Sequence, residues 1–254
     1  MTALHGLFED AGGVTALNSR VEAVEPLHTG GAGDLPGSAG WRITATDGAT
    51  GEASTITAET LVNAAGLGAV DVHNAILEAA APALEPAARA ARRKTLYYAK
   101  GNYFSYAASA PRVARLIYPV TLPGAGGLGT HLTLDLAGRL RFGPDVEWVD
   151  DPTDLVVNEA RFPAAVAAIQ RYLPSIDVSA LSPDYAGIRP KLSKAGAVGA
   201  GKGFLDFYIK KEEGFEGWVN LLGMESPGLT SSLAVGEYVT GLLYGMESGR
   251  GTEE

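Results

Sequence analysis

The segment 61–77 constrains the fold of this chain more than any other stretch. Residues 61–65 form an apolar run that predicts a buried strand, and the small residues at 66–68 predict a tight turn. The helix expected next carries its apolar residues on one side: Val72, Ile76 and Leu77. A strand, a turn and a helix in this order are typical of a doubly wound α/β sheet, so we expect one here.

The sequence before this segment predicts a short helix and two further strands. The helix is expected at 2–10, and alternating residues predict the strands at 14–26 and 41–46. The glycine-rich stretch 28–40 has no periodicity and predicts a surface insertion without a function of its own. Proline and alanine residues over 80–90 predict a change of domain.

Short β-type runs separated by turn residues fill positions 97–146 and predict an antiparallel sheet. In the run 130–136, alternation places His131, Thr133 and Asp135 on one face. The leucines at 132, 134 and 136 should occupy the opposite face. This sheet should therefore have one polar side that can face a ligand.

The last third of the chain predicts a return to the first sheet. A helix is expected at 161–174, strands at 184–192, 204–211 and 217–223, and a closing helix that begins near Ser226 and Pro227. Leu229 and Leu233 should pack on the buried side of that helix, and its free N-terminal amides should favour negative charge. The predicted fold class is α/β (α+β), with an antiparallel sheet inserted at 81–214 into a partial doubly wound sheet.

Composition excludes several classes of function. A net charge of -9 without any Lys/Arg-rich run argues against nucleic-acid partners, and the absence of cysteine excludes disulfides, thiolate metal sites and cysteine nucleophiles. The four histidines lie far apart in the sequence and form no metal-binding motif, so we expect no metal. No apolar run is long enough for a transmembrane helix, and residues 1–13 resemble neither a signal peptide nor a mitochondrial presequence.

Four motifs occur in an order that resembles one enzyme family. They are VNAAG at 62–66, AKGNYF at 99–104, AGIRPKL at 186–192 and GMESPGLTSSLA at 223–234. Together they resemble L-2-hydroxyglutarate dehydrogenases and related FAD enzymes of the D-amino-acid and glycine oxidase superfamily. The resemblance implies an FAD-binding part at 1–80 and 215–254 and a substrate-binding part at 81–214. It also implies oxidation of a small 2-hydroxy acid, with L-2-hydroxyglutarate as the first candidate substrate. The resemblance implies a mitochondrial location, and without it the sequence would leave a cytoplasmic location open.

The resemblance implies two groups of cofactor-binding residues. One group is the small-residue turn Ala64, Ala65 and Gly66, and the other is Gly223, Pro227, Gly228, Leu229 and Thr230. Small residues let the backbone approach a dinucleotide, and a helix start can stabilise negative charge on a reduced flavin. The alternatives are tight packing of helix on sheet for the first group and an ordinary capped helix for the second.

Substrate binding is predicted for two cations and three other side chains. Arg189 matches the arginine that holds the substrate carboxylate in glycine oxidase-like enzymes, and Lys191 shares its strand face as a second cation. His131 is the candidate base for the hydroxyl proton, with Tyr103 or Tyr118 orienting the substrate. A structural ion pair for Arg189 and a hydrogen-bonded sheet position for His131 are the alternatives.

One departure from the family bears on function. Its members open with a βαβ unit that carries G-x-G-x-x-G, and no such unit precedes Met1, so the ADP half of the FAD site is expected to be missing. The sequence therefore also admits a non-catalytic remnant or binding partner. An amine or amino-acid oxidase of the same fold is the enzymatic alternative, and no residue indicates the electron acceptor.

Overall fold

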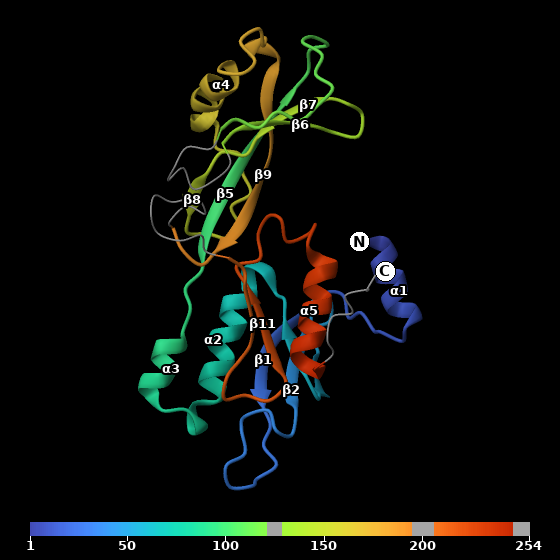
Figure 1. Cartoon of the computed structure of the whole chain (residues 1–254), viewed down its shortest axis with the longest axis vertical. Coiled ribbons are helices and arrows are strands. Elements are labelled where there is room, and N and C mark those ends of the chain that lie inside the picture. The colour runs from blue at the N-terminus through green and yellow to red at the C-terminus, as the bar shows by residue number, and fades with distance from the viewer. Residues whose placement is uncertain (121–128, 195–205, 246–254) are drawn as a thin grey trace, which may run out of the picture. The chain divides into compact units, whose positions relative to one another are not determined.

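The computed structural model describes residues 1–120, 129–194 and 206–245 (Figure 1). The chain divides into two compact units. Unit 1 contains residues 1–62, 71–93 and 211–219. Unit 2 contains residues 63–70, 94–210 and 220–254. The predicted division into an FAD-binding part and a substrate-binding part remains a prediction, because these units are defined by contacts within the chain and not by bound ligands.

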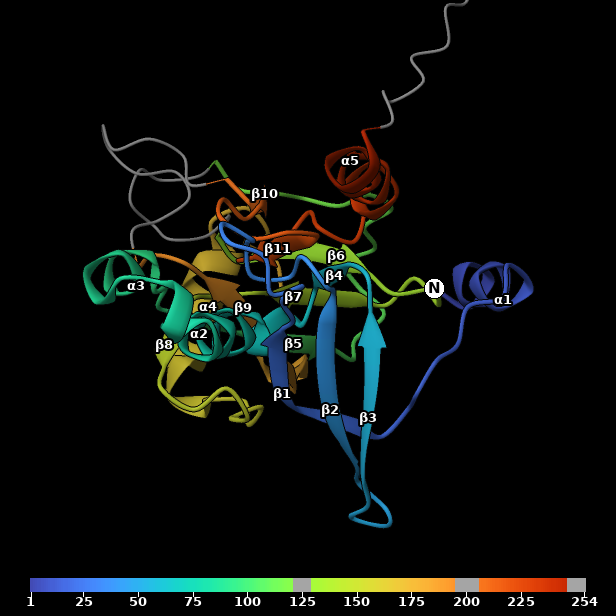
Figure 2. The ribbon, with the colours of Figure 1, turned by 90° about the horizontal axis from the view of Figure 1, so that it is seen from below.

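Unit 1 contains a three-stranded antiparallel sheet of order β1-β2-β3 (Figure 2). Its elements are α1 (Thr2–Asp10), β1 (Ser19–Pro26), β2 (Trp41–Asp47) and β3 (Ala53–Ala58). The predicted helix at 2–10 is confirmed, whereas β1 begins five residues later than predicted and β3 was not predicted. Because five of the six β3 residues are exposed, this strand has no apolar alternation for sequence reasoning to detect.

The core of unit 1 gathers aromatic rings from both ends of the chain. Trp41 on β2 packs with Phe215 and Trp218, and Ile76 and Leu77 are fully buried beside them. The last two belong to α2 (Ala69–Ala79), whose predicted apolar side is confirmed. The indole Nε1 of Trp41 donates to the carbonyl of Glu216 at 3.1 Å, which links β2 to a segment 175 residues further on.

The predicted strand, turn and helix at 61–77 are confirmed. They correspond to β4 (Leu61–Asn63), the 3-10 turn η1 (Gly66–Gly68) and α2. β4 is the edge strand of a sheet of order β10-β11-β4, which also contains β10 (Tyr208–Lys211) and β11 (Trp218–Leu222). The small helix α3 (Pro86–Arg92) follows η2 (Ala81–Ala83) in the stretch interpreted as a domain junction.

Unit 2 contains the predicted antiparallel sheet. Its strands are β5 (Tyr97–Tyr106), β6 (His131–Leu134), β7 (Leu140–Gly143), β8 (Glu147–Val149) and β9 (Leu181–Lys191). The order is β6-β7-β5-β8, and β9 pairs with β5 along the length of both strands. The α/β class predicted from the sequence is therefore confirmed by helices and sheets in one chain.

One face of this sheet is covered by α4 (Phe162–Gln170), as Figure 1 shows. Phe142 and Leu132 from the sheet and Ile169 from α4 are fully buried in the shared core. Two 3-10 turns, η3 (Glu159–Arg161) and η4 (Val178–Ala180), flank the helix. The helix ends at Gln170, four residues before the predicted stop at Pro174.

Two sequence predictions are wrong at the ends of elements. Leu136 was assigned to the buried face but is fully exposed, because the strand ends at Leu134 and a turn follows, closed by hydrogen bonds to the carboxylate of Asp135. The closing helix α5 (Ser232–Tyr244) begins after Ser231, not near Ser226. Leu229 and Leu233 are exposed, and Val239 is the buried residue of α5.

Within the described ranges, no helix combines the length and apolar character needed to cross a membrane.

Candidate functional site

All the residues predicted from the sequence to bind cofactor or substrate lie in unit 2. The turn η1 lies against β9. Leu192, just beyond β9, packs with Val70 after η1 and with Leu222 on β11. Gly223 has a φ of 67°, which favours glycine, and a Cβ there would lie 3.0 Å from Leu192 Cγ where these segments meet. The fold thus brings three of the four family motifs together.

Arg189 and Lys191 project from one face of β9 and share one carboxylate. The ammonium of Lys191 lies 2.5 Å from Glu225 Oε1, and a guanidinium nitrogen of Arg189 lies 3.8 Å from Glu225 Oε2. Lys191 is buried and committed to this pair, whereas the Arg189 side chain is 30% exposed. Within the described part of the chain, the Arg189 guanidinium donates no hydrogen bond, so its planar donor fork remains available to a ligand.

Glu225 also shapes the turn that follows it. Its backbone carbonyl accepts from the amide of Gly228 at 2.6 Å, and a Cβ on Gly228 would lie 2.7 Å from that oxygen. No described residue accepts from the amides of Leu229 and Thr230, which lie in an exposed turn before α5. Two unpaired backbone donors suit a partly negative ligand edge such as the pyrimidine end of a flavin.

The VNAAG turn is held by a buried amide. The Asn63 side chain donates to the carbonyl of Ala69 at 2.7 Å and to Asn220 Oδ1 at 2.8 Å. Ala64 and Ala65 are exposed above it, and Gly66 has a φ of 57° with open space where a Cβ would stand. This turn presents bare backbone, which is compatible with close approach of a dinucleotide.

His131 is buried at the start of β6, on the polar face predicted from the alternation. Its Nδ1 lies 3.0 Å from the carbonyl of Gly129, and a carbonyl can only accept, so Nδ1 carries the proton. Nε2 then has a free lone pair, which no described residue occupies. Burial, and after it the positive charge of Arg189, lower the pKa of His131, while the bond to Gly129 opposes the shift. The imidazole is therefore neutral at pH 7 and can accept a proton.

Of the two predicted tyrosines, Tyr118 contacts His131 and Tyr103 lies beside the strand partner of His131. The ring of Tyr118 stacks on the imidazole with centroids 4.2 Å apart, and it is half exposed. Gly143 pairs with His131 across the sheet, and a Cβ there would lie 2.8 Å from the ring of Tyr103. Tyr103 stacks in turn on Tyr185 with centroids 4.4 Å apart. Tyr118 thus contacts the histidine, Tyr103 lies beside Gly143, the strand partner of the histidine, and Tyr185 was missed by sequence reasoning.

The AKGNYF motif has a second role that its sequence did not reveal. The ammonium of Lys100 lies 2.7 Å from Asp154, and Asn102 donates to both Asp145 and Glu147. Burial alone would lower the pKa of Lys100, but Asp154 and Glu147 raise it. These buried groups lie on the sheet face opposite to Arg189 and fasten the 145–158 segment to β5.

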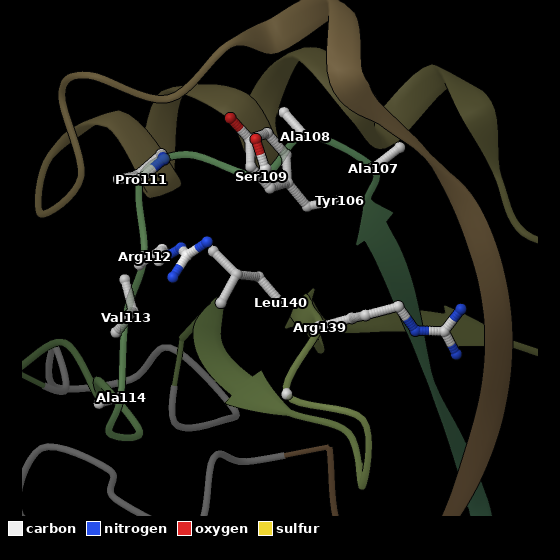
Figure 3. A pocket seen from close by; sticks show the side chains of 11 residues that line it. Tyr106, Ala107, Ala108, Ser109, Pro111, Arg112, Val113, Ala114, Arg139 and Leu140 are labelled. Carbon is white, nitrogen blue, oxygen red and sulfur yellow. The ribbon is translucent and has the colours of Figure 1, made fainter.

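A cavity of about 570 Å³ in unit 2 lies apart from these residues (Figure 3). Its lining includes Tyr106, Arg112, Arg139 and Leu140, and none of the predicted site residues. Figure 3 shows the side chain of Arg139 extending away from Arg112, and it pairs with Asp135 at 2.7 Å. The two cations therefore do not converge on one ligand. Among the described residues, no group of three His, Asp or Glu side chains could hold a metal ion.

Sequence reasoning missed Glu225, although it lies inside a motif that had been noted. Its partners precede it by 34 and 36 residues, so no local pattern reveals the contact. The available signal was an acid directly before the Ser-Pro-Gly turn of a motif assigned to anion binding. Such an acid needs cations nearby, and the only motif rich in cations is AGIRPKL.

Comparison with known proteins identifies the class to which this arrangement belongs. The family of FAD dependent oxidoreductases matches residues 1–242, and the chain is a member of this family. The resemblance inferred from the four motifs is therefore confirmed, and FAD is the cofactor of the family.

Individual relatives agree with the family. The mitochondrial L-2-hydroxyglutarate dehydrogenase of Arabidopsis thaliana is 44% identical over 155 residues, which cover 56% of this chain and 31% of that protein. The FAD-bound L-alpha-glycerophosphate oxidase of Mycoplasma pneumoniae has a similar fold, with a TM-score of 0.70 at 17% identity over 95% of this chain and 54% of that one. Glycine oxidase from Bacillus cereus has a TM-score of 0.63 at 14% identity, over 100% of this chain and 57% of that one. The matched parts of the chain thus span 31% to 57% of the length of these proteins.

Proposed function

We propose that this chain contributes to FAD-dependent oxidation of a small 2-hydroxy acid to the 2-oxo acid, with L-2-hydroxyglutarate as the first candidate. The observation that carries the proposal is the guanidinium of Arg189, which has unused donors and lies close enough to lower the pKa of a neutral, buried His131. A carboxylate bound to Arg189 would lie on the same face of the sheet as the histidine, which would be the base for its α-hydroxyl group.

Oxidation of the substrate removes a hydride from Cα and a proton from the hydroxyl group. Bound FAD would supply the hydride acceptor. The proton goes to Nε2 of His131, whose lone pair is free because Nδ1 donates to Gly129. Tyr118, which stacks on the imidazole, and Tyr103, which lies beside Gly143, would orient the substrate. Lys191 contributes indirectly, because its ammonium fixes Glu225 beside Arg189.

The residues that would hold the cofactor are those of the two open turns. In the first, Ala64, Ala65 and Gly66 offer exposed backbone. In the second, the amides of Leu229 and Thr230 would donate to the flavin, and Gly223, Pro227 and Gly228 give the turn its shape. The choice of L-2-hydroxyglutarate and a mitochondrial location are proposed from the Arabidopsis relative, which is named for both.

The test is a spectroscopic titration of the purified chain after incubation with FAD and removal of the unbound cofactor. We expect a retained flavin band that bleaches when L-2-hydroxyglutarate is added without oxygen, and much less bleaching with glycine. His131→Gln should slow the bleaching at least tenfold, a modest loss for a general base. His28→Gln, at an exposed histidine in unit 1, is the matched control.

Three results would contradict the proposal. A folded chain that retains no flavin would show that it does not bind the family cofactor by itself. Faster bleaching by glycine than by the hydroxy acid would favour an amino-acid oxidase. Unchanged bleaching in His131→Gln would remove the histidine from the reaction.

A further inference from the structure

Lys194 stands over two aromatic rings on the polar face of the unit 2 sheet. Its ammonium lies 5.6 Å from the ring centre of Tyr97 and 6.0 Å from that of Trp148. The residue is exposed, and no carboxylate in the described part of the chain pairs with it. Aromatic faces hold an ammonium in place without neutralising its charge, so Lys194 remains able to bind an anion.

The register of the strands places Lys194 near Arg189. Ala99 on β5 pairs with Arg189 on one side and with Trp148 on the other, and Tyr97 pairs with Lys191. Paired residues share a face, so all of these side chains lie on the same side of the sheet. Trp148 and Arg189 are two strand spacings apart, roughly 10 Å between backbones. Ala99 between them contributes only a methyl group.

Among the described residues, the charges around Arg189 and Lys194 leave a net charge of two positive units. The Arg189, Lys191 and Lys194 side chains carry three positive charges, and Glu225 supplies one negative charge. Because Glu225 is 2.5 Å from Lys191 and 3.8 Å from Arg189, its charge is committed mainly to the lysine. Two positive charges remain, and two carboxylates would balance them.

We propose that Lys194, held by Tyr97 and Trp148, forms a second carboxylate subsite that makes this face selective for short dicarboxylates. The proposal rests on the proposed function, because it takes Arg189 as the site of the first carboxylate. Arg189 and Trp148, the ring beneath the Lys194 ammonium, are the two strand partners of Ala99. A five-carbon diacid, whose carboxyl carbons stand about one strand spacing, roughly 5 Å, apart, is short enough to lie between the two cations. A monocarboxylate of equal length would fill only the Arg189 end.

Trp148 provides a local signal for the test. The sequence has three tryptophans, and the other two, Trp41 and Trp218, are fully buried in the core of unit 1. Trp148 is partly exposed beneath the Lys194 ammonium. A ligand that pairs with Lys194 should therefore change the fluorescence of Trp148 without changing that of the other two.

The experiment titrates the chain with glutarate and with pentanoate, and follows binding by calorimetry and by tryptophan fluorescence. The two acids differ in one terminal carboxylate. Lys194→Gln should weaken glutarate binding roughly tenfold, as expected for loss of one charged hydrogen bond, and leave pentanoate unchanged. Lys210→Gln is the matched control, because Lys210 is also exposed and lies 5.3 Å from the ring of Tyr208.

Arg189→Gln separates this inference from the proposed function, because it should weaken both acids. If it does so while Lys194→Gln changes neither, the second subsite is wrong and carboxylate capture by Arg189 stands. If Arg189→Gln changes neither acid, carboxylate capture itself is wrong. Equal affinity of the unchanged chain for glutarate and pentanoate, or no binding of glutarate, would also overturn the second subsite.

Discussion

The ammonium of Lys191 and the carboxylate of Glu225 form an ion pair of 2.5 Å in which the two side chains are 7% and 18% exposed. The pair joins the last residue of β9 to the segment that leads into the turn of Leu229 and Thr230. Removal of one partner would leave a charge buried without compensation, which costs far more than the pair contributes when intact.

Glu225→Gln should therefore lower the free energy of unfolding by roughly 2 kcal/mol, less than the 3–5 kcal/mol for a fully buried pair because Glu225 keeps some contact with water. Denaturation in urea measures the change. The double variant Lys191→Met, Glu225→Leu should recover most of the loss, because it removes both charges. Glu25→Gln is the control: its 3.2 Å pair with Arg42 is half exposed and should change stability by less than about 0.5 kcal/mol. If Glu225→Gln and Glu25→Gln lowered the free energy of unfolding equally, the pair of Lys191 and Glu225 would not behave as a buried ion pair.

The fold was predictable where apolar residues recur with the period of an element. The apolar side of α2 and the antiparallel sheet of unit 2 were predicted from such patterns. The strand β3 and the helix α3 were missed because neither contains a buried residue, so their sequences lack the signal. The start of α5 was misplaced because Gly228 and Ser231 donate backward to Glu225 and Pro227 and close a turn instead of a helix. Such bonds leave no mark in the pattern of apolar residues.

The candidate site was predictable at the level of motifs and less so at the level of contacts. Sequence spacing assigned Arg189 and Lys191 to one face, but it could not show that one of them is neutralised by Glu225. Likewise the AKGNYF motif was noted for its resemblance, while Lys100 and Asn102 were not expected to lie away from the substrate face. Contacts between distant residues depend on the register of strands, which the sequence does not state.

The environment of His131 predicts a measurable titration. Its pKa is lowered by burial and then by Arg189, so NMR should find it below the ordinary value of about 6.5. Arg189→Gln should move it upward, because one positive charge is removed. Arg20→Gln, at an exposed arginine in unit 1, should leave it unchanged. If Arg189→Gln leaves the pKa of His131 unchanged, the charge of Arg189 does not act on the histidine.

The same shift predicts how stability depends on pH. Below about pH 6.5 the unfolded chain binds a proton at His131 that the folded chain does not, so the folded state loses stability as pH falls toward the lowered pKa. His131→Gln should remove this part of the slope. Urea denaturation of the unchanged chain and of His131→Gln, repeated from pH 7.5 to 5, measures both unfolding free energies. As the pH falls, the unchanged chain should lose more stability than the variant. A constant difference would argue against a lowered pKa.

Two tyrosines in the core of unit 2 differ in their hydrogen bonds. The hydroxyl of Tyr172 is buried, no described residue forms a hydrogen bond with it, and its burial raises the pKa of the phenol. The hydroxyl of Tyr106 donates to Ala110 at 2.6 Å and accepts from the amide of Asp177. Tyr172→Phe should leave stability unchanged or raise it by up to about 1 kcal/mol, whereas Tyr106→Phe should lower it by roughly 1–2 kcal/mol. Thermal and urea unfolding of both variants provide the comparison, and the reverse order would show that Tyr172 has a partner.

Asn102 predicts the largest effect in the network behind the sheet. It is fully buried, its side chain donates to Asp145 at 3.0 Å and to Glu147 at 3.1 Å, and it accepts from the amide of Asn158 at 2.9 Å. Asn102→Ala should cost roughly 3 kcal/mol, because three partly buried partners lose a hydrogen bond at once.

Asn102→Asp keeps the shape of the side chain but places a third negative charge beside Asp145 and Glu147. This variant should be the less stable of the two at pH 7 and should regain stability as the pH falls, because protonation of the new carboxyl group restores a donor and removes the repulsion. Ser105→Ala, on the same strand and with an exposed hydrogen bond of 3.2 Å to Ser182, should cost no more than about 0.5 kcal/mol. Equal stability of Asn102→Asp and the unchanged chain at pH 7 would contradict this prediction, because Asp145 and Glu147 could then not both be ionised around Asn102. Lys100, which lies 3.6 Å from Glu147, would in that case lack a charged partner in Glu147.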